Sequence, residues 1–143
     1  MDSWEVEARV AIADLVARYN AAGDSARFDR VIELFTDDAV MVVEGTPHAG
    51  HEAIRGIFTN ARTRVDGGRS RPTHVRHFTA THQVDLVDPD RATGYCYFQV
   101  LTPIGLDHWG RYIDDYRRAD ETWKFASRRV EVDGRAKGSL FRP

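Results

Sequence analysis

Three histidines fall at positions 74, 77 and 82 of the stretch THVRHFTATHQVDL, residues 73–86. Imidazole titrates near neutral pH and is a common metal ligand, so this stretch could carry a proton-transfer site or a metal site. The stretch has the pattern of a β-strand, in which successive side chains point to opposite faces. His74 and His82 are then expected on one face and His77 on the other. Histidines divided in this way cannot converge on one metal ion, so we expect no metal site.

Apolar side chains occur on both faces of this expected strand. Phe78 and Val84 fall on the face of His82, whereas Val75 falls on the face of His77. We therefore expect both faces to be partly covered, one by helices and one by a partner subunit. A histidine on a covered face is often a neutral ring hydrogen-bonded to a core partner, and this structural alternative stays open for each histidine.

The chain as a whole limits the classes of partner. Its 143 residues fit a single domain, and 20 Lys and Arg against 22 Asp and Glu leave a net charge of −2 without a basic cluster. Nucleic-acid binding needs a concentrated basic field, so none is expected. Cys96 is the only cysteine and falls in the apolar run GYCYFQV, which predicts a buried thiol. The N-terminus lacks the pattern of a signal peptide and no apolar run approaches ~20 residues, so we expect a cytoplasmic protein without a membrane partner.

The expected secondary structure begins with helices. Apolar residues recur at three- and four-residue steps over residues 4–24, which predicts a helix starting near Ser3 and stopping near Gly23. A short helix at 25–35, a strand at 37–45 and a third helix at 50–62 follow, before a loop at 65–72.

Beyond that loop the apolar period changes to two. Two hairpins are expected, turning at DPD and at DE, with strands at residues 73–87, 91–102, 108–119 and 122–133. Helices followed by antiparallel strands indicate one α+β domain over residues 1–143, with helices on one face of a curved sheet and a concave space between them. The tail after about residue 134 is expected to be loosely held.

Five segments occur in the order AIADLVARYNAAGD, VIELFTDDAVMVVEG, HFTATHQVDLVDPDRATGY, GRYIDDYRR and WKFASRR. Together they resemble the SnoaL-like family of the nuclear-transport-factor-2-like superfamily, which includes scytalone dehydratase and hexachlorocyclohexane dehydrochlorinase. The resemblance covers nearly the whole chain. It implies a cone-shaped, cystatin-like α+β barrel, with a curved antiparallel sheet wrapped around the N-terminal helices and a central cavity. It implies no cofactor.

The resemblance also implies a site. Members of the family use an aspartate–histidine pair in the cavity, which matches Asp24 and His77, and the dehydrochlorinase has an essential arginine that matches Arg128. The implied lining residues are Tyr19, Val75, Phe98, Val100 and Tyr112. Tyr19 stands where the dehydrochlorinase has a lysine. His108 lies near the region of the second histidine of scytalone dehydratase, but is expected in a turn.

An imidazole oriented by a carboxylate can remove a proton from carbon next to a carbonyl or a leaving group. The guanidinium of Arg128 could stabilise the developing negative charge, and a hydroxyl of Tyr19 or Tyr112 could donate to it. The expected function is therefore a cofactor-independent lyase or isomerase, working by dehydration, elimination or proton transfer on a small hydrophobic cyclic substrate.

Several alternatives stay open. Asp24 could be only the N-cap of the short second helix, and Arg128 could form a surface ion pair. The chain could be a non-catalytic small-molecule-binding or assembly module of the same fold, or the small subunit of an aromatic-ring dioxygenase. Tyr95 and Tyr97 are expected on the outer sheet face, where they suggest a homo-oligomer, either a dimer or a trimer.

Overall fold

The computed structural model describes residues 1–66 and 74–141, with only the backbone of residues 62–66. The elements in chain order are α1 (Ser3–Asp24), α2 (Phe28–Glu33), β1 (Phe35–Val43), β2 (Thr46–Ala49), α3 (His51–Asp66), β3 (Arg76–Asp88), β4 (Arg91–Thr102), β5 (Gly105–Ala119) and β6 (Thr122–Arg135). No helix in these ranges combines the length and apolar character needed to cross a bilayer.

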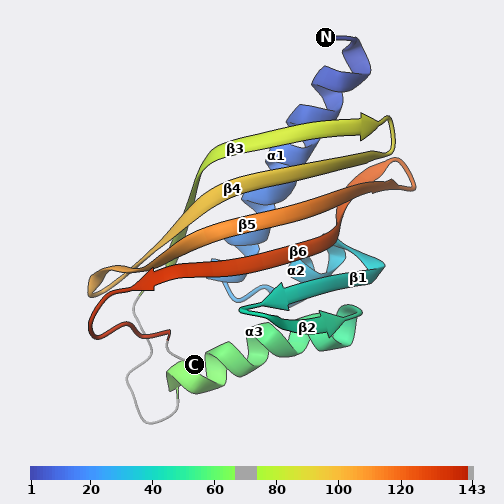
Figure 1. Ribbon diagram of the computed structural model, residues 1–143. Helices are drawn as coiled ribbons and strands as arrows, with labels where there is room; N and C mark the ends of the chain where they lie inside the picture. The colour runs from blue at the N-terminus through green and yellow to red at the C-terminus, as the bar shows by residue number, and fades with distance from the viewer. Residues whose placement is uncertain (67–73, 142–143) are drawn as a thin grey trace.

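The strands form one six-stranded sheet in the order β2-β1-β6-β5-β4-β3, and α1 lies across one face of it (Figure 1). The predicted α+β class, with helices packed on one face of a curved sheet, is confirmed. The sheet is open, because β2 and β3 are edges. It is also mixed, since β1 runs parallel to β6 while every other pair is antiparallel. A parallel pair needs a long crossover, and here β2, α3 and three further strands supply it.

Helix α1 positions one end of the site. Asp2 rather than Ser3 is its N-cap, and the Asp2 backbone N donates to the Glu5 carboxylate at 2.6 Å. The helix continues past Gly23 and ends with Asp24, one residue beyond the predicted stop. Asp24 is therefore part of α1, and the N-cap of α2 is Arg27. The prediction that Asp24 could cap α2 is wrong.

A bulge in β3 overturns the predicted parity of the histidines. The register passes from Ala80 opposite Tyr97 to Gln83 opposite Tyr95, and Thr81 takes a positive φ of 54°. One extra residue in a strand turns all later side chains to the other face. His77 and His82 consequently both face the helices, although they are five residues apart.

Two observations fix these faces. The Nε2 of His82 lies 3.2 Å from the hydroxyl of the buried Tyr116. Phe78, predicted to share a face with His82, is 50% exposed on the other side. His74 precedes β3 and is exposed.

Gly110 in β5 allows the neighbouring strands to pack closely against its backbone. A Cβ on Gly110 would overlap the Glu131 carbonyl oxygen and the ring of Phe98. We expect Gly110→Ala to lower the free energy of unfolding by about 1–3 kcal/mol, the usual cost of overpacking, as measured by urea unfolding. Gly56→Ala is the control: in α3 its Cβ meets nothing within 4 Å, so better helix propensity should add about 0.5–1 kcal/mol. A Gly110→Ala protein as stable as wild type would contradict the close contacts that the structure places around Gly110.

Two features of the chain ends matter for the site. Near the start, Arg9 Nη1 in α1 donates to the Val84 carbonyl of β3 at 2.5 Å. At the other end, Ser139 is only 1% exposed and donates a hydrogen bond to Asp107. The expected loosely held tail after residue 134 is instead tied into the fold as far as Phe141.

Candidate active site

Asp24 and His77 meet where the end of α1 reaches the start of β3. The Asp24 Oδ1 lies 2.5 Å from the His77 Nδ1, and the Oδ2 accepts a hydrogen bond from the His77 backbone N at 2.9 Å. One carboxylate thus holds both the ring and the strand that carries it. Since an ionised carboxylate only accepts hydrogen bonds, Nδ1 carries the proton and Nε2 is left as the basic nitrogen. The Asp24 side chain is 11% exposed and that of His77 24%.

A second aspartate–histidine pair stands beside the first. His108 lies within β5, not in the predicted turn, and its Nδ1 is 2.8 Å from the Asp107 Oδ1. Its ring centre lies 6.4 Å from that of His77, with the two rings nearly perpendicular. Burial lowers the pKa of His108, and nearby His77 lowers it further, although Asp107 acts in the opposite direction. The sequence contained the adjacent Asp–His pair, but not its inward orientation.

The rings between the two histidines come from the inner face of the sheet. Phe98 has its ring centre 6.4 Å from His77 and 6.1 Å from His108, and it stacks on Tyr112 at 4.6 Å. Val100 is fully buried and is the register partner of both histidines. Three of the expected lining residues therefore lie around or directly behind the paired histidines.

The other two expected lining residues differ in position. Val75 is half-buried against the core just before β3. Tyr19 lies behind Tyr112, with ring centres 5.9 Å apart. Burial raises the pKa of Tyr19 to about 12 and also raises that of Tyr112, so both are neutral phenols. The Tyr112 hydroxyl donates to the Asn20 side chain at 3.2 Å, a partner that the sequence did not indicate.

Arg128 is completely buried, which excludes the surface ion pair considered from the sequence. Its Nε and Nη2 donate to the Asp114 carboxylate at 2.7 and 2.8 Å. Its Cζ lies 3.9 Å from the ring centre of Tyr112 and 4.3 Å from those of Tyr19 and Phe125. Burial alone would lower the pKa of Arg128, but the charge and hydrogen bonds of Asp114 outweigh it and raise the pKa.

The structure does not bring Arg128 beside His77. The contacts that connect them run through two rings, from His77 to Phe98 and then through the stacked Tyr112 to the guanidinium. The Arg128 Nη1 is buried and has no hydrogen-bond partner among the described residues. It is the one nitrogen of this guanidinium that makes no hydrogen bond to these residues, so its N–H groups are free for another oxygen.

A polar network extends from Arg128 to the middle of β3. The Tyr116 hydroxyl donates to Asp114 at 2.8 Å, so the His82 Nε2, 3.2 Å from that hydroxyl, carries a proton and donates to it. Burial lowers the pKa of His82, with a smaller opposing effect of Asp114 and a lowering effect of Arg128.

This lowered pKa predicts acid sensitivity. The unfolded chain binds a proton at His82 near pH 6.5, before the folded protein does. The free energy of unfolding should then be highest above pH 6.5 and fall as the pH drops toward the folded pKa, by at most about 1.4 kcal/mol per pH unit for this proton. His82→Gln should flatten the fall, measured by urea unfolding at pH 8, 7, 6 and 5. His108 remains in the variant, so part of the fall should persist. Equal slopes would show that His82 does not contribute.

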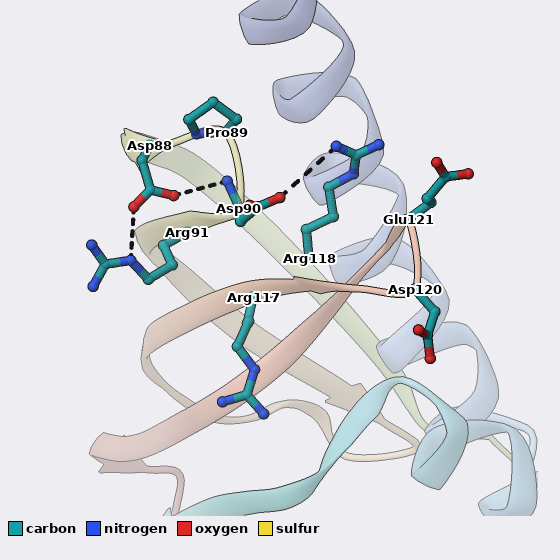
Figure 2. Close-up of a pocket in the computed structure, with 8 residues that line it drawn as sticks. All are labelled: Asp88, Pro89, Asp90, Arg91, Arg117, Arg118, Asp120 and Glu121. Carbon is teal, nitrogen blue, oxygen red and sulfur yellow. Dashed lines mark hydrogen bonds and ion pairs between the residues drawn. The ribbon is translucent and has the colours of Figure 1, made fainter.

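The surface hollows among the described residues include two of about 500 Å³ each. One borders the Asp24 side of the site and is lined by Ala21, Asp24, Ser25 and Arg76. The other lies at the hairpin turns, at the far end of β3 from His77 (Figure 2). There Arg91 pairs with Asp88 and Arg118 with Asp90. Arg117 pairs with Asp38, so the three cations of this hollow already have anionic partners. Within the described ranges, no group of three or more His, Cys, Asp or Glu side chains is placed to hold a metal ion.

The sequence matches the family model of the SnoaL-like domain over residues 4–129. No curated protein sequence gives a significant match. Many solved structures share the fold. A provisionally assigned aromatic ring hydroxylase from Novosphingobium aromaticivorans is 29% identical, with 90% of this chain and 91% of that chain covered and a TM-score of 0.72.

Two less similar sequences superpose more closely. Hexachlorocyclohexane dehydrochlorinase LinA-type3 from Novosphingobium barchaimii is 22% identical over 95% of this chain and 93% of that chain, with a TM-score of 0.79. A provisionally assigned scytalone dehydratase from N. aromaticivorans is 16% identical over 95% and 91%, with a TM-score of 0.80. At these identities the likeness shows a common fold.

Proposed function

We propose, from the premise that this chain belongs to the SnoaL-like domain family, that it is a cofactor-independent lyase or isomerase acting on a small hydrophobic ring compound. The observation that carries the proposal is the double hold of Asp24 on His77, through the ring nitrogen and the backbone. A histidine that served only packing would not need a largely buried carboxylate aligned with its ring. Structures with the same fold include a dehydrochlorinase, which is a lyase-type enzyme.

In this proposal His77 is the general base. Its Nε2 removes a proton from a carbon next to a carbonyl or a leaving group, while Asp24 keeps the proton on Nδ1 and stabilises the imidazolium. The carbon's electron pair then forms a double bond as the leaving group departs, a hydroxyl leaving as water with the proton that His77 has taken. Alternatively the pair forms an enolate, which the His77 imidazolium reprotonates at another carbon. The first outcome is elimination or dehydration, and the second is isomerisation.

The second histidine accepts rather than donates. Because the Nδ1–H of His108 donates its hydrogen bond to Asp107, the neutral ring presents an unprotonated Nε2. The lowered pKa of His108 favours this neutral form. We assign it the role of accepting a hydrogen bond from a hydroxyl or water at the reacting ring, which keeps the substrate opposite His77.

Arg128 supplies a permanent positive charge behind the lining rings. Asp114 occupies two of its nitrogens, so we assign Nη1 as the donor for an oxygen on which negative charge develops. Direct contact of Nη1 with the substrate requires the stacked rings of Phe98 and Tyr112 to part.

A non-catalytic binding or assembly module is the second candidate. The observation in its favour is the filling of the space between α1 and the sheet by Tyr19, Tyr112 and Phe125 around Arg128. A third candidate is the small subunit of an aromatic-ring dioxygenase, because a structure provisionally assigned as an aromatic ring hydroxylase is 29% identical to this chain. Co-purification with a larger iron-containing partner would support that role.

We also propose that a second copy of the chain covers the outer face of the sheet, giving a dimer or a trimer. Phe78, Tyr97 and Trp109 are exposed on neighbouring strands of this face. Light scattering coupled to gel filtration measures the state, and a monomer at micromolar concentration would exclude this proposal.

Proton removal can be tested before the substrate is known. A panel of cyclic ketones and hydroxyketones is incubated with the protein in D₂O, and NMR follows deuterium entering next to the carbonyl. Exchange above the buffer rate is the expected result, because base attack labels the carbon even without net turnover. Absence of exchange in every compound, combined with binding of some of them, would favour the binding module.

A further inference from the structure

Asp107 is a carboxylate with no exposed surface, on which four hydrogen-bond donors converge. The hydroxyls of Thr102 and Ser139 donate to it at 3.1 and 2.5 Å. The His108 Nδ1 and the Leu140 backbone N donate at 2.8 and 2.9 Å. Burial raises the pKa of Asp107, but these hydrogen bonds together hold it below its ordinary value. A buried anion with every partner a donor is a built feature, since an unsatisfied one would be costly.

A β-bulge turns both Asp107 and His108 inward. Between β4 and β5 the register passes from Val100 opposite His108 to Leu101 opposite Leu106. Asp107 therefore has no residue opposite it on β4. Regular alternation would put one of the two neighbours on each face, whereas both are buried here. Bulges re-aim side chains in this way next to functional sites.

The same carboxylate holds residues 136–141, which we call the C-terminal segment. Besides the bonds from Ser139 and Leu140, the Asp107 carbonyl accepts from the Ala136 backbone N at 2.8 Å. The ring of Phe141 lies 5.2 Å from that of His108, centre to centre. The segment therefore packs directly against one of the two histidines of the site.

We propose that Asp107 is a positioning residue, which holds the His108 imidazole opposite His77 and, with the same two oxygens, fastens the C-terminal segment as a wall of the substrate space. The inference rests on the proposed function for the identity of that space. Because both tasks use one carboxylate, release of the segment removes two of its four donors. The carboxylate can then rotate, and the imidazole bonded to it turns as well.

Ser139→Ala tests this coupling with a small change. It removes one donor of the segment and leaves Asp107 and His108 in place. We expect faster hydrogen exchange of the amides of residues 136–141, altered imidazole signals of His108 in long-range ¹H–¹⁵N NMR spectra, and a kcat lowered about 10- to 100-fold with a smaller change in KM. The matched control is Ser127→Ala, whose hydroxyl donates to Asp115 at 2.8 Å on the exposed face. The control should leave all three readouts unchanged.

Asp107→Asn is the stronger variant, because it keeps the side-chain shape and replaces one acceptor oxygen with a donor. Its NMR and kcat effects should exceed those of Ser139→Ala. Circular dichroism checks folding, and if Asp107→Asn does not fold, Ser139→Ala alone decides. Release of the segment with wild-type His108 signals and wild-type kcat would overturn the inference.

The outcomes separate this inference from the proposed function. Hydrogen exchange and the His108 signals need no substrate, so they judge the coupling by themselves. Failure of the proposed function appears instead as absence of deuterium exchange into every ring compound by the wild-type protein. Full catalysis in a variant whose segment is released would leave the proposed function standing and remove Asp107 from it.

Discussion

Replacing His77 with alanine is expected to lower kcat for any ring compound that the protein turns over by about 10²- to 10⁴-fold, the usual contribution of a general base. The reason is geometric, since His77 is the ring that Asp24 holds at 2.5 Å with its other nitrogen unprotonated. KM should change little, because the base acts mainly in the transition state. Steady-state kinetics measures both constants. The fold should survive, since the His77 side chain is only partly buried.

Three further variants test this assignment. Asp24→Asn keeps the shape but offers an amide to His77, which favours the wrong tautomer, so a loss of similar size is expected. The double variant should be little worse than either single one, because the two residues act as a unit. His48→Ala, on β2, should keep wild-type kcat. Turnover that survives His77→Ala would refute the base assignment and favour a binding module.

Arg128→Met is expected to lower the free energy of unfolding by about 3–5 kcal/mol, the usual cost of leaving one partner of a buried ion pair uncompensated. Asp114, only 2% exposed, would remain as a buried anion, with Tyr116 as its one side-chain donor among the described residues. Urea unfolding measures the loss. Arg129→Met is the matched control, because Arg129 pairs with Glu131 at 3.0 Å on the surface. That change should cost about 0–1 kcal/mol.

A double-mutant cycle separates charge from packing at this pair. If the cost comes from the stranded charge, Arg128→Met combined with Asp114→Asn should be less destabilising than the sum of the single changes. A loss below about 1 kcal/mol in Arg128→Met would instead show that the pair behaves like an exposed one. The stability measurement must accompany any kinetic one, since an unfolded Arg128 variant is inactive whatever the role of the guanidinium.

The parts of the fold with local signals could be predicted from the sequence. Strand β4 occupies residues 91–102 as the alternation of side chains predicted. The DE turn also holds: Asp120 and Glu121 both have positive φ, as a two-residue hairpin turn requires. Strand β2 was missed, because Thr46–Ala49 is mostly exposed and becomes a strand only by pairing with β1.

The site depended on features that have no local signal. The pairing of Asp24 with His77, 53 residues apart, was implied only by the family resemblance. Bulges then decided which side chains meet. A regular hairpin counted from the DE turn pairs Asp114 with Ser127, but a register shift at Tyr116 places it opposite Arg128. Such shifts arise from the fit between neighbouring strands, and the residues that bulge carry no distinctive sequence pattern.

The hold of Asp24 on His77 also bears on how the protein avoids aggregation. Strand β3 is an edge of the sheet, and an edge exposes backbone groups on which another chain can add a strand. Asp24 occupies the backbone N–H of His77, and Arg9 occupies the carbonyl of Val84. Helix α1 therefore blocks the open edge at two points, one of them through the carboxylate that orients the proposed base. Variants made at Asp24 to alter chemistry will also unblock an edge, so their solubility should be followed together with their activity.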